Sequence, residues 1–292
     1  MRIIRKIFKM KSIKMWNIAG FGWIILRNIL LICGFFLIAA PLYLVLVNSF
    51  KSLEEAGRNF FSFPSSLNMD NFKNLFASQN YLGYVKNSAL ITVVSILIEV
   101  CLVPSVSYAI ARNFRRPYFL FVYFFLLMGL FIPSQVVILP VTKFMTGIKM
   151  LNHAGLILLY ATFSLTRGVF LFVNYIRTMP YELEEAARVD GCNVFMTYTS
   201  IILPLTGPMM ATMIVMDALW YWNDFMLPLM LLNRSRGFWT LPLFQYNFKT
   251  EYSFNYTMSF TAYLVSMLPI LIIYIIGQKS IIKGLTAGAV KG

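Results

Sequence analysis

The stretch EEAARVDGCNVFMTYTSIILPL, residues 184–205, is a charged segment between two strongly apolar stretches. Five charged residues fall among the nine residues from 182 to 190. Each such charge costs roughly 2.5–3.5 kcal/mol at the centre of a bilayer, so we expect the segment to lie in water or against protein. If the flanking stretches cross a membrane, this segment connects them on one side.

The composition supports a membrane protein. The 292 residues are 59% hydrophobic and 12% charged, and their mean hydropathy of +0.71 lies outside the range of ordinary soluble domains. Uncharged or nearly uncharged runs that are long enough to cross a bilayer occupy 30–47, 89–110, 117–142, 154–176, 201–232 and 258–278. We therefore predict an all-α integral membrane protein with six transmembrane helices.

The distribution of basic residues predicts the orientation. An even number of spans places both termini on one side, and fifteen of the 25 lysines and arginines lie in segments on that side, against nine on the other. We predict that both termini are cytoplasmic, and the net charge of +14 then requires no nucleic acid partner. The predicted parts are a basic segment at 1–27, a six-span domain at 28–278 and a tail at 279–292. The first 26 residues agree with an amphipathic helix on the inner leaflet and equally with a solvated tail.

The sequence contains no catalytic or metal-binding pattern. The three cysteines form no CxxC pair, no GxSxG motif accompanies the single histidine, and the GxxxxGK[ST] motif of a P-loop is absent. We predict that the chain is not an enzyme and holds neither a metal nor a cofactor. Any ATP that it depends on would be handled by another chain.

The charged segment has the start and stop signals of a short helix. Pro180 is a natural opener, three glutamates occupy the first turns where the helix dipole favours them, and Gly191 is placed for a left-handed turn. Asn193 is placed to cap a second turn. One face combines Leu183, Ala186, Ala187 and the edge of Asp190 at helical spacing. A docking helix for a partner and a solvated connection both agree with this pattern.

The segment resembles the EAA loop of permease subunits of binding-protein-dependent ABC importers. The matching positions, within 180–204, are Glu185, Ala186, Ala187, Gly191, Ile201, Leu203 and Pro204. Further stretches, among them IPSQVVILP, WNDFMLPL and the ending GAVKG, are similar to the carbohydrate-uptake branch and its shorter, maltose-type permease.

This resemblance implies the type I ABC importer permease fold and a role in ATP-driven import of sugars or oligosaccharides across a bacterial cell membrane. It implies a second permease as heterodimer partner, two ATPase subunits that hold ATP and magnesium, and an extracellular solute-binding protein. In the family the EAA helix docks into a cleft of the ATPase subunit. The coupling role would then fall on Glu185, Ala186, Ala187, Gly191, Leu203 and Pro204, and the tail would also contact the ATPases.

Several polar residues lie inside the predicted spans, where exposure to lipid is costly. They are Glu99, Arg167, Asp217, Trp222, Asn223 and Asp224. The last three join an aromatic ring, an amide and a carboxylate, as sugar sites do, although we favour hydrogen bonds between helices as their role. We also predict that Glu99 and Arg167 pair across the second and fourth spans.

The alternative function is a secondary transporter driven by an ion gradient, with Glu99, Asp217 and Asp224 as proton or cation sites. Such folds usually contain two similar halves with discontinuous helices, and no internal repeat is evident in this sequence.

Overall fold

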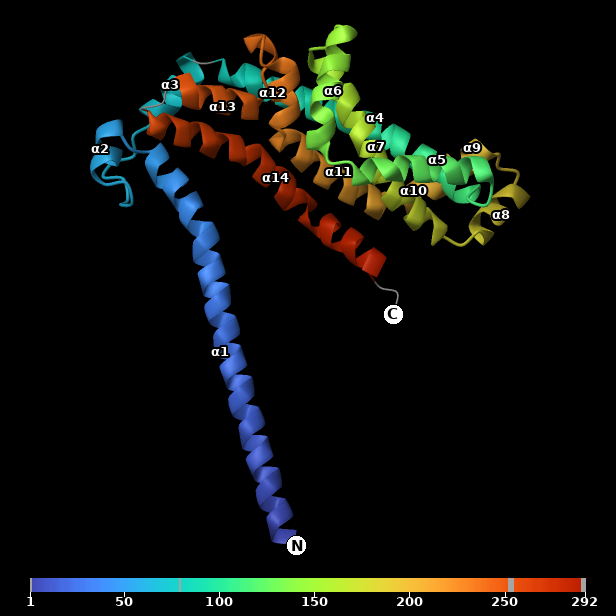
Figure 1. Cartoon of the computed structure of the whole chain (residues 1–292), viewed down its shortest axis with the longest axis horizontal. Helices are drawn as coiled ribbons and strands as arrows, with labels where there is room; N and C mark the ends of the chain where they lie inside the picture. The colour runs from blue at the N-terminus through green and yellow to red at the C-terminus, as the bar shows by residue number, and fades with distance from the viewer. Residues whose placement is uncertain (1, 79, 252–254, 290–292) are drawn as a thin grey trace. The chain divides into compact units, whose positions relative to one another are not determined.

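The fold is a set of helices, seen in a computed structural model of the chain (Figure 1). The backbone is described for residues 2–78, 80–251 and 255–289, and the side chains for 23–77, 80–133, 135–246 and 255–278. The described secondary structure is entirely helical. The chain divides into a smaller compact unit, residues 1–72 and 255–264, and a larger one, residues 73–254 and 265–292. The two units are described separately below.

The smaller unit contains the first long helix and the loop that follows it. Helix α1 (Arg2–Ser49) includes the predicted span 30–47, and its part Trp23–Ser49 is long and apolar enough to cross a membrane. Thr261 Oγ1, near the start of α14, donates to the carbonyl of Ser49 at 3.1 Å. The backbone is helical from Arg2, but the side chains of residues 1–22 lie outside the described residues. Both predicted places for this segment, on the inner leaflet or in solvent, therefore stay predictions.

A buried lysine organises the loop after α1, which includes α2 (Leu53–Arg58). Lys51 is fully buried, and its ammonium donates to the carbonyls of Asn59 at 2.8 Å and Ser62 at 2.6 Å. The N–H of Ser65 donates to Glu55 Oε1 at 2.6 Å, and this hydrogen bond lowers the pKa of the Glu55 carboxyl. Polar contacts of this kind hold a loop in which large apolar side chains such as Phe61, Phe63 and Leu67 stay exposed.

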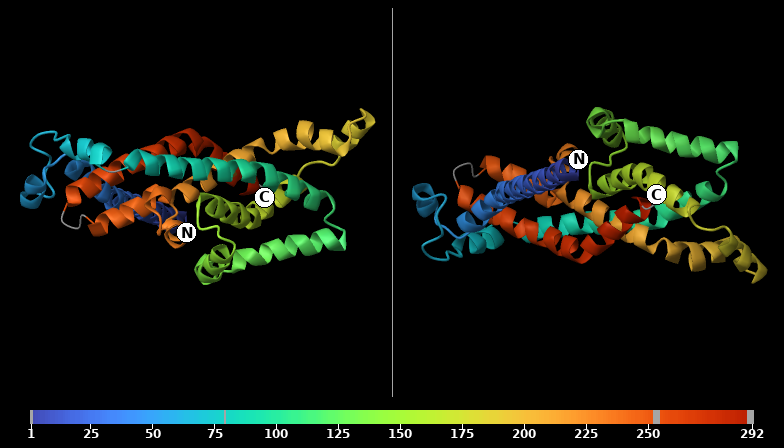
Figure 2. Two further views of the ribbon diagram at one scale, coloured as in Figure 1. Left: turned by 90° about the horizontal axis from the view of Figure 1, so that it is seen from above. Right: turned by 90° about the horizontal axis from the view of Figure 1, so that it is seen from below.

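The larger unit is built around α4 (Tyr81–Arg112) and α7 (His153–Arg177), which contain the predicted spans 89–110 and 154–176. Gly168 of α7 allows these helices to approach closely, because a Cβ there would lie 2.7 Å from Cγ1 of the buried Val103. Helix α5 (Pro117–Met128) follows α4 and lies beside α7 (Figure 2).

The predicted third span, 117–142, is bent. It comprises α5, the 3₁₀ helix η1 (Gly129–Phe131) and α6 (Ser134–Gly147), and its two halves meet at 108°. Pro133 lies at the bend, where a proline removes a backbone donor and restricts the preceding residue to extended conformations.

The predicted fifth span, 201–232, is also interrupted. The helices Val194–Leu205 and Gly207–Asn223 meet at 69° next to Pro208. The second of them ends at Asn223, because the backbone is extended at Asp224. The elements of this region are α9 (Val194–Thr197), the π-helix η2 (Tyr198–Ile202), α10 (Leu203–Leu205), α11 (Gly207–Asn223) and α12 (Met226–Leu232). A continuous apolar run therefore does not form a continuous helix here.

The remaining helices are α3 (Asp70–Ser78), α8 (Glu182–Val189), η3 (Arg236–Phe238), α13 (Leu241–Glu251) and α14 (Tyr256–Ala289). The predicted sixth span, 258–278, lies within α14. The described residues thus contain four helices long and apolar enough to cross a membrane, or up to six if each bent pair is one span. The α14 backbone stays helical through Ala289, while the side chains of the predicted tail, 279–292, lie outside the described residues.

The contact at Gly168 generates a prediction. The substitution Gly168→Ala places a methyl group against Val103, and overpacking of this kind costs about 1–3 kcal/mol. We expect a lower thermal unfolding midpoint for the purified protein in nanodiscs. Gly147→Ala is the control, because a Cβ at Gly147 meets nothing within 4 Å. An unchanged midpoint for Gly168→Ala would show that α4 and α7 are not in close contact there.

Candidate functional site

Helix α8 carries the charged segment. Glu182, Glu184 and Glu185 lie in its first turn, where the partial positive charge of the helix end stabilises them. The helix begins at Glu182, with Tyr181 at the N-cap, so the proline before it lies outside the helix. At the other end Gly191 has φ +82°, and the N–H of Cys192 donates to the carbonyl of Ala187 at 2.9 Å. The predicted left-handed turn at Gly191 is confirmed.

The chain then turns directly into the membrane-length helices. Asn193 accepts the N–H of Met196 at 2.9 Å and so caps α9, as predicted. Leu203 and Pro204 form α10, immediately before the bend that leads into α11. Movement of α8 would therefore act on α11 through about one turn each of α9, η2 and α10.

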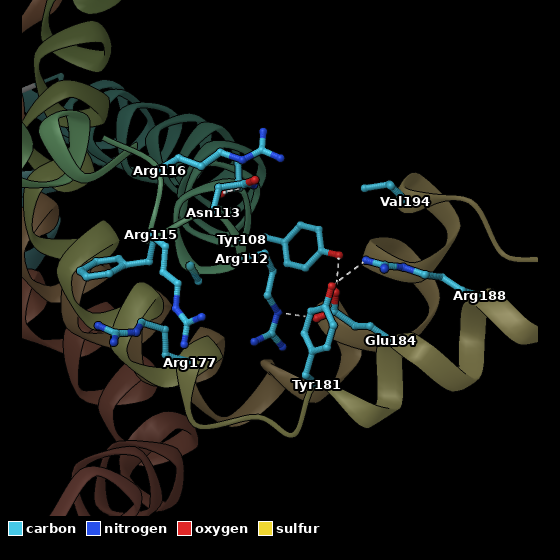
Figure 3. A pocket seen from close by; sticks show the side chains of 13 residues that line it. Tyr108, Arg112, Asn113, Arg115, Arg116, Arg177, Tyr181, Glu184, Arg188 and Val194 are labelled. Carbon is cyan, nitrogen blue, oxygen red and sulfur yellow. Dashed lines mark hydrogen bonds and ion pairs between the residues drawn. The ribbon is translucent and has the colours of Figure 1, made fainter. Parts of the chain in front are cut away.

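A buried ion pair attaches α8 to α4 (Figure 3). Glu184 is 1% exposed, and its carboxylate pairs with the guanidinium of Arg112 and accepts the hydroxyl of Tyr108 at 2.9 Å. Tyr108 and Arg112 are four residues apart on α4 and so share one face of that helix. Hydrogen bonds to an ionised carboxylate are among the stronger ones in proteins, especially when they are buried. The last turn of α4 is therefore fixed to the first turn of α8.

The outward face of α8 differs from the predicted one. Ala187 is 4% exposed, and it lies three residues after Glu184 on the side of α8 that is buried within the chain. The predicted face is wrong in this respect, because that pairing turns Ala187 inward. Ala186, Glu185 and Gly191 are exposed or partly exposed, together with Leu183 at 40% and Val189 at 88%. These residues form the exposed surface of α8.

The four charged residues within the spans are paired with side chains of other helices. Asn223 is not, because its amide donates to the carbonyl of Leu219 in the same helix α11 at 2.8 Å, so the hydrogen bond between helices that we favoured is wrong for this residue. Arg167 of α7 forms an ion pair with Asp217 of α11, which is 2% exposed. Glu99 of α4, 1% exposed, accepts the hydroxyl of Tyr221 at 3.0 Å and also interacts with Ser164. The predicted direct ion pair between Glu99 and Arg167 is therefore wrong, although the two side chains are near enough to interact electrostatically.

Arg167 pairs with Asp217 and not with Glu99 because α7 packs antiparallel to α11. Tyr160 donates its hydroxyl to Asp224 at 2.9 Å and stacks on Tyr221 with ring centroids 4.7 Å apart. Polar residues at i, i+4 and i+7 of α7 thus face a matching series on α11 in reverse order. The two series are Tyr160, Ser164 and Arg167, and Asp217, Tyr221 and Asp224. This shared spacing was present in the sequence and identifies Tyr160, Ser164 and Tyr221, which we had not singled out.

A groove of about 510 Å³ opens beside this cluster. It is lined by Leu219, Trp220, Asn223, Asp224, Phe225 and Met226. Trp222, predicted to belong to a sugar-like site, is 6% exposed and does not line the groove, whereas Trp220 is 36% exposed and does. The described residues contain no group of three or more His, Cys, Asp or Glu side chains arranged to hold a metal ion.

Helices of membrane length, with the short charged helix α8 between two of them, agree with a membrane component of a transport system. The chain belongs to the family described as "Binding-protein-dependent transport system inner membrane component", which matches residues 104–286.

Individual relatives agree with the predicted resemblance to carbohydrate-uptake permeases. The multiple sugar-binding transport system permease protein MsmG of Streptococcus mutans is 44% identical over 91% of this chain and 96% of its own length. The arabinooligosaccharides transport system permease protein AraQ of Halalkalibacterium halodurans is 33% identical over 88% and 92%. The fold is similar to a chain of a bacterial ABC transporter that imports alginate, with a TM-score of 0.73, 20% identity, and coverage of 90% and 96%.

The ion pair between α4 and α8 generates one prediction. Glu184→Gln leaves the Arg112 guanidinium without its counter-ion, and a buried pair that loses one partner is destabilised by about 3–5 kcal/mol. At the lower end of that range, we expect amide exchange across α8 to accelerate roughly a hundredfold. Hydrogen–deuterium exchange mass spectrometry measures this exchange. Glu185→Gln, on the exposed neighbour, should change little. Slow exchange in Glu184→Gln would show that the pair does not hold α8.

The ion pair between Arg167 and Asp217 generates a second prediction. Arg167→Gln leaves the buried carboxylate of Asp217 unpaired, so the unfolding midpoint in nanodiscs should fall, and the added substitution Asp217→Asn should recover part of the loss. The matched control adds Glu99→Gln to Arg167→Gln instead. If the unfolding midpoint recovered with Glu99→Gln but not with Asp217→Asn, the partner of Arg167 would be Glu99, which would contradict the structure.

Proposed function

We propose that this chain is a transmembrane permease subunit of a type I ABC importer for sugars or oligosaccharides. In this proposal it crosses a bacterial cell membrane six times, with both termini in the cytoplasm. The observation that carries the proposal is helix α8, whose exposed residues with EAA spacing are joined to the spans at two places. Glu184 joins α8 to α4, and the chain through Leu203 and Pro204 joins it to α11.

The proposed mechanism begins on partner subunits. Two ATPase subunits bind ATP and magnesium, and their closure moves α8, which docks through Glu185, Ala186 and the turn at Gly191. Because α8 is attached to both α4 and α11, its movement rotates these helices and switches the pathway between its two open states. A second permease forms the other wall of the pathway, and an extracellular solute-binding protein delivers the sugar.

The proposed sugar cargo is supported by the names of relatives and by one groove in this chain. MsmG and AraQ are named for the transport of sugars, and a solved relative of similar fold is in complex with an alginate pentasaccharide-bound periplasmic protein. In this chain Trp220 and Asn223 line the groove of about 510 Å³, and an aromatic face with an amide suits a sugar ring and its hydroxyls. We assign Glu99, Arg167, Asp217 and Asp224 to fixing the helices, since each is already paired.

The alternative, transport driven by an ion gradient, needs acids that exchange protons or cations. Glu99, Asp217 and Asp224 are each held by a donor from another helix, which favours structural roles for them. Sugar uptake that persisted after deletion of the partner ATPase genes would support the alternative and contradict the proposal.

The turn at Gly191 provides the test of coupling. A β-branched residue is strongly disfavoured at φ +82°, and left-handed backbone costs an L-residue roughly 1–2 kcal/mol, whereas asparagine tolerates it. We expect Gly191→Val to lower uptake roughly tenfold, given that strain, and Gly191→Asn to retain most of it. Uptake is measured with a labelled sugar chosen by ligand screening of the partner binding protein.

Copurification of the ATPase and permease subunits serves as the assembly control for both variants. Normal uptake by the valine variant would contradict the coupling role of this turn. Loss of uptake in both variants, with normal assembly, would mean that the glycine is needed for a reason other than its backbone conformation.

A further inference from the structure

A pocket of about 950 Å³ lies where α4 ends and α8 begins (Figure 3). Its lining contains five arginines and a single acid. These are Arg112, Arg115, Arg116, Arg177, Arg188 and Glu184. The coupling mechanism proposed above uses only the ion pair of Arg112 with Glu184. It gives no role to the other four arginines.

The described lining offers one carboxylate, that of Glu184, to all five arginines. Arg112 takes up the only acid of the pocket. Arg177 lies over the ring of Phe114 at 4.0 Å, and Arg188 donates to the Tyr181 hydroxyl at 2.9 Å, a hydrogen bond that raises the pKa of Arg188 further. The Phe114 ring and the Tyr181 hydroxyl carry no charge, so these contacts hold the guanidinium groups in place without neutralising them. Of the two arginines, Arg188 also interacts electrostatically with the Glu184 carboxylate.

Arg115 and Arg116 are exposed, and neither forms an ion pair within the part of the chain that the structure describes. They occupy the short connection between α4 and α5, and Figure 3 shows them at the side of the pocket away from α8. The pocket therefore carries a net positive charge, five arginines against one carboxylate, between four helices (α4, α7, α8 and α9) and the connection from α4 to α5.

The position of the pocket along the spans indicates its depth. The apolar helices α4 and α7 end at Arg112 and Arg177, and the apolar helix α5 begins at Pro117. Two membrane-length helices thus end at the pocket, and the apolar α5 begins next to it, which is the level of lipid headgroups. Next to it, α5 exposes Tyr118 at 70% and Phe121 at 66%.

We propose that this arginine pocket binds the phosphate group of an anionic phospholipid. Guanidinium groups bind phosphate oxygens in pairs of parallel hydrogen bonds, and basic pockets between membrane helices suit lipid headgroups. The apolar side chains of Phe114 and Val194 in the lining, and the exposed aromatic rings of α5 beside it, favour a lipid over an acidic protein segment. The inference goes beyond the proposed function and does not depend on the cargo.

The test uses the intact transporter, purified from membranes and examined by native mass spectrometry with added phosphatidylglycerol or phosphatidylcholine. Each arginine near an anionic lipid surface contributes about fivefold to binding, so the double variant Arg115→Gln with Arg116→Gln should retain phosphatidylglycerol roughly thirtyfold less well. Arg58→Gln with Arg234→Gln is the matched control, because it removes two exposed arginines that do not line the pocket.

The expected result is selective loss of phosphatidylglycerol in the pocket variant, with the control unchanged. Equal retention in both variants would overturn the proposal. Competition by inorganic phosphate at millimolar concentration, without preference for phosphatidylglycerol over phosphatidylcholine, would overturn the lipid as the source of the phosphate. Dissociation of the ATPase subunits from the pocket variant, with lipid retention intact, would assign the arginines to a protein contact and also overturn it.

Discussion

A carboxylate buried among apolar helices is costly unless a donor reaches it, and in the larger unit three buried carboxylates and the half-buried carboxylate of Asp224 are held in this way. Tyr221 reaches Glu99, Arg167 reaches Asp217, Tyr160 reaches Asp224, and Arg112 reaches Glu184. Each contact joins two different helices. The few acids of a strongly apolar chain therefore determine which helix faces meet, while apolar packing, as at Gly168, determines how closely they approach.

These contacts also suggest how movement passes through the molecule. Glu184 lies on the helix that carries the EAA spacing, and its partner Arg112 is the last residue of α4. Glu99 lies on the same helix α4 and contacts α11 and α7. A displacement of α8 would therefore reach the groove beside Trp220 and Asn223 by two routes: directly along the chain into α11, and across the ion pair into α4.

Local features were predictable from the sequence, and pairings between helices were not. The left-handed turn at Gly191 and the cap at Asn193 depend on residues close in the chain, and the apolar runs predicted the positions of α4, α7 and α14. The pairing of Arg167 depends on the register and direction of two packed helices, which the residue types alone leave open. The matching i, i+4, i+7 series on α7 and α11 was the available signal. The inward direction of Ala187 follows from the burial of Glu184, which no local rule specifies.

The central claim is that α8 and α4 move together when the ATPase subunits close. The exposed Cys101 on α4 and a cysteine introduced at Val189 on α8 provide two sites for spin labels once Cys33, Cys192 and the cysteines of the partner subunits are replaced. Double electron–electron resonance on the assembled transporter then compares the label distance without nucleotide and with ATP. We predict that the distance between the labels is the same without nucleotide and with ATP. When Glu184→Gln is added, we predict that the distance differs between these two states. A shift of several ångströms on ATP binding with Glu184 intact would contradict the account.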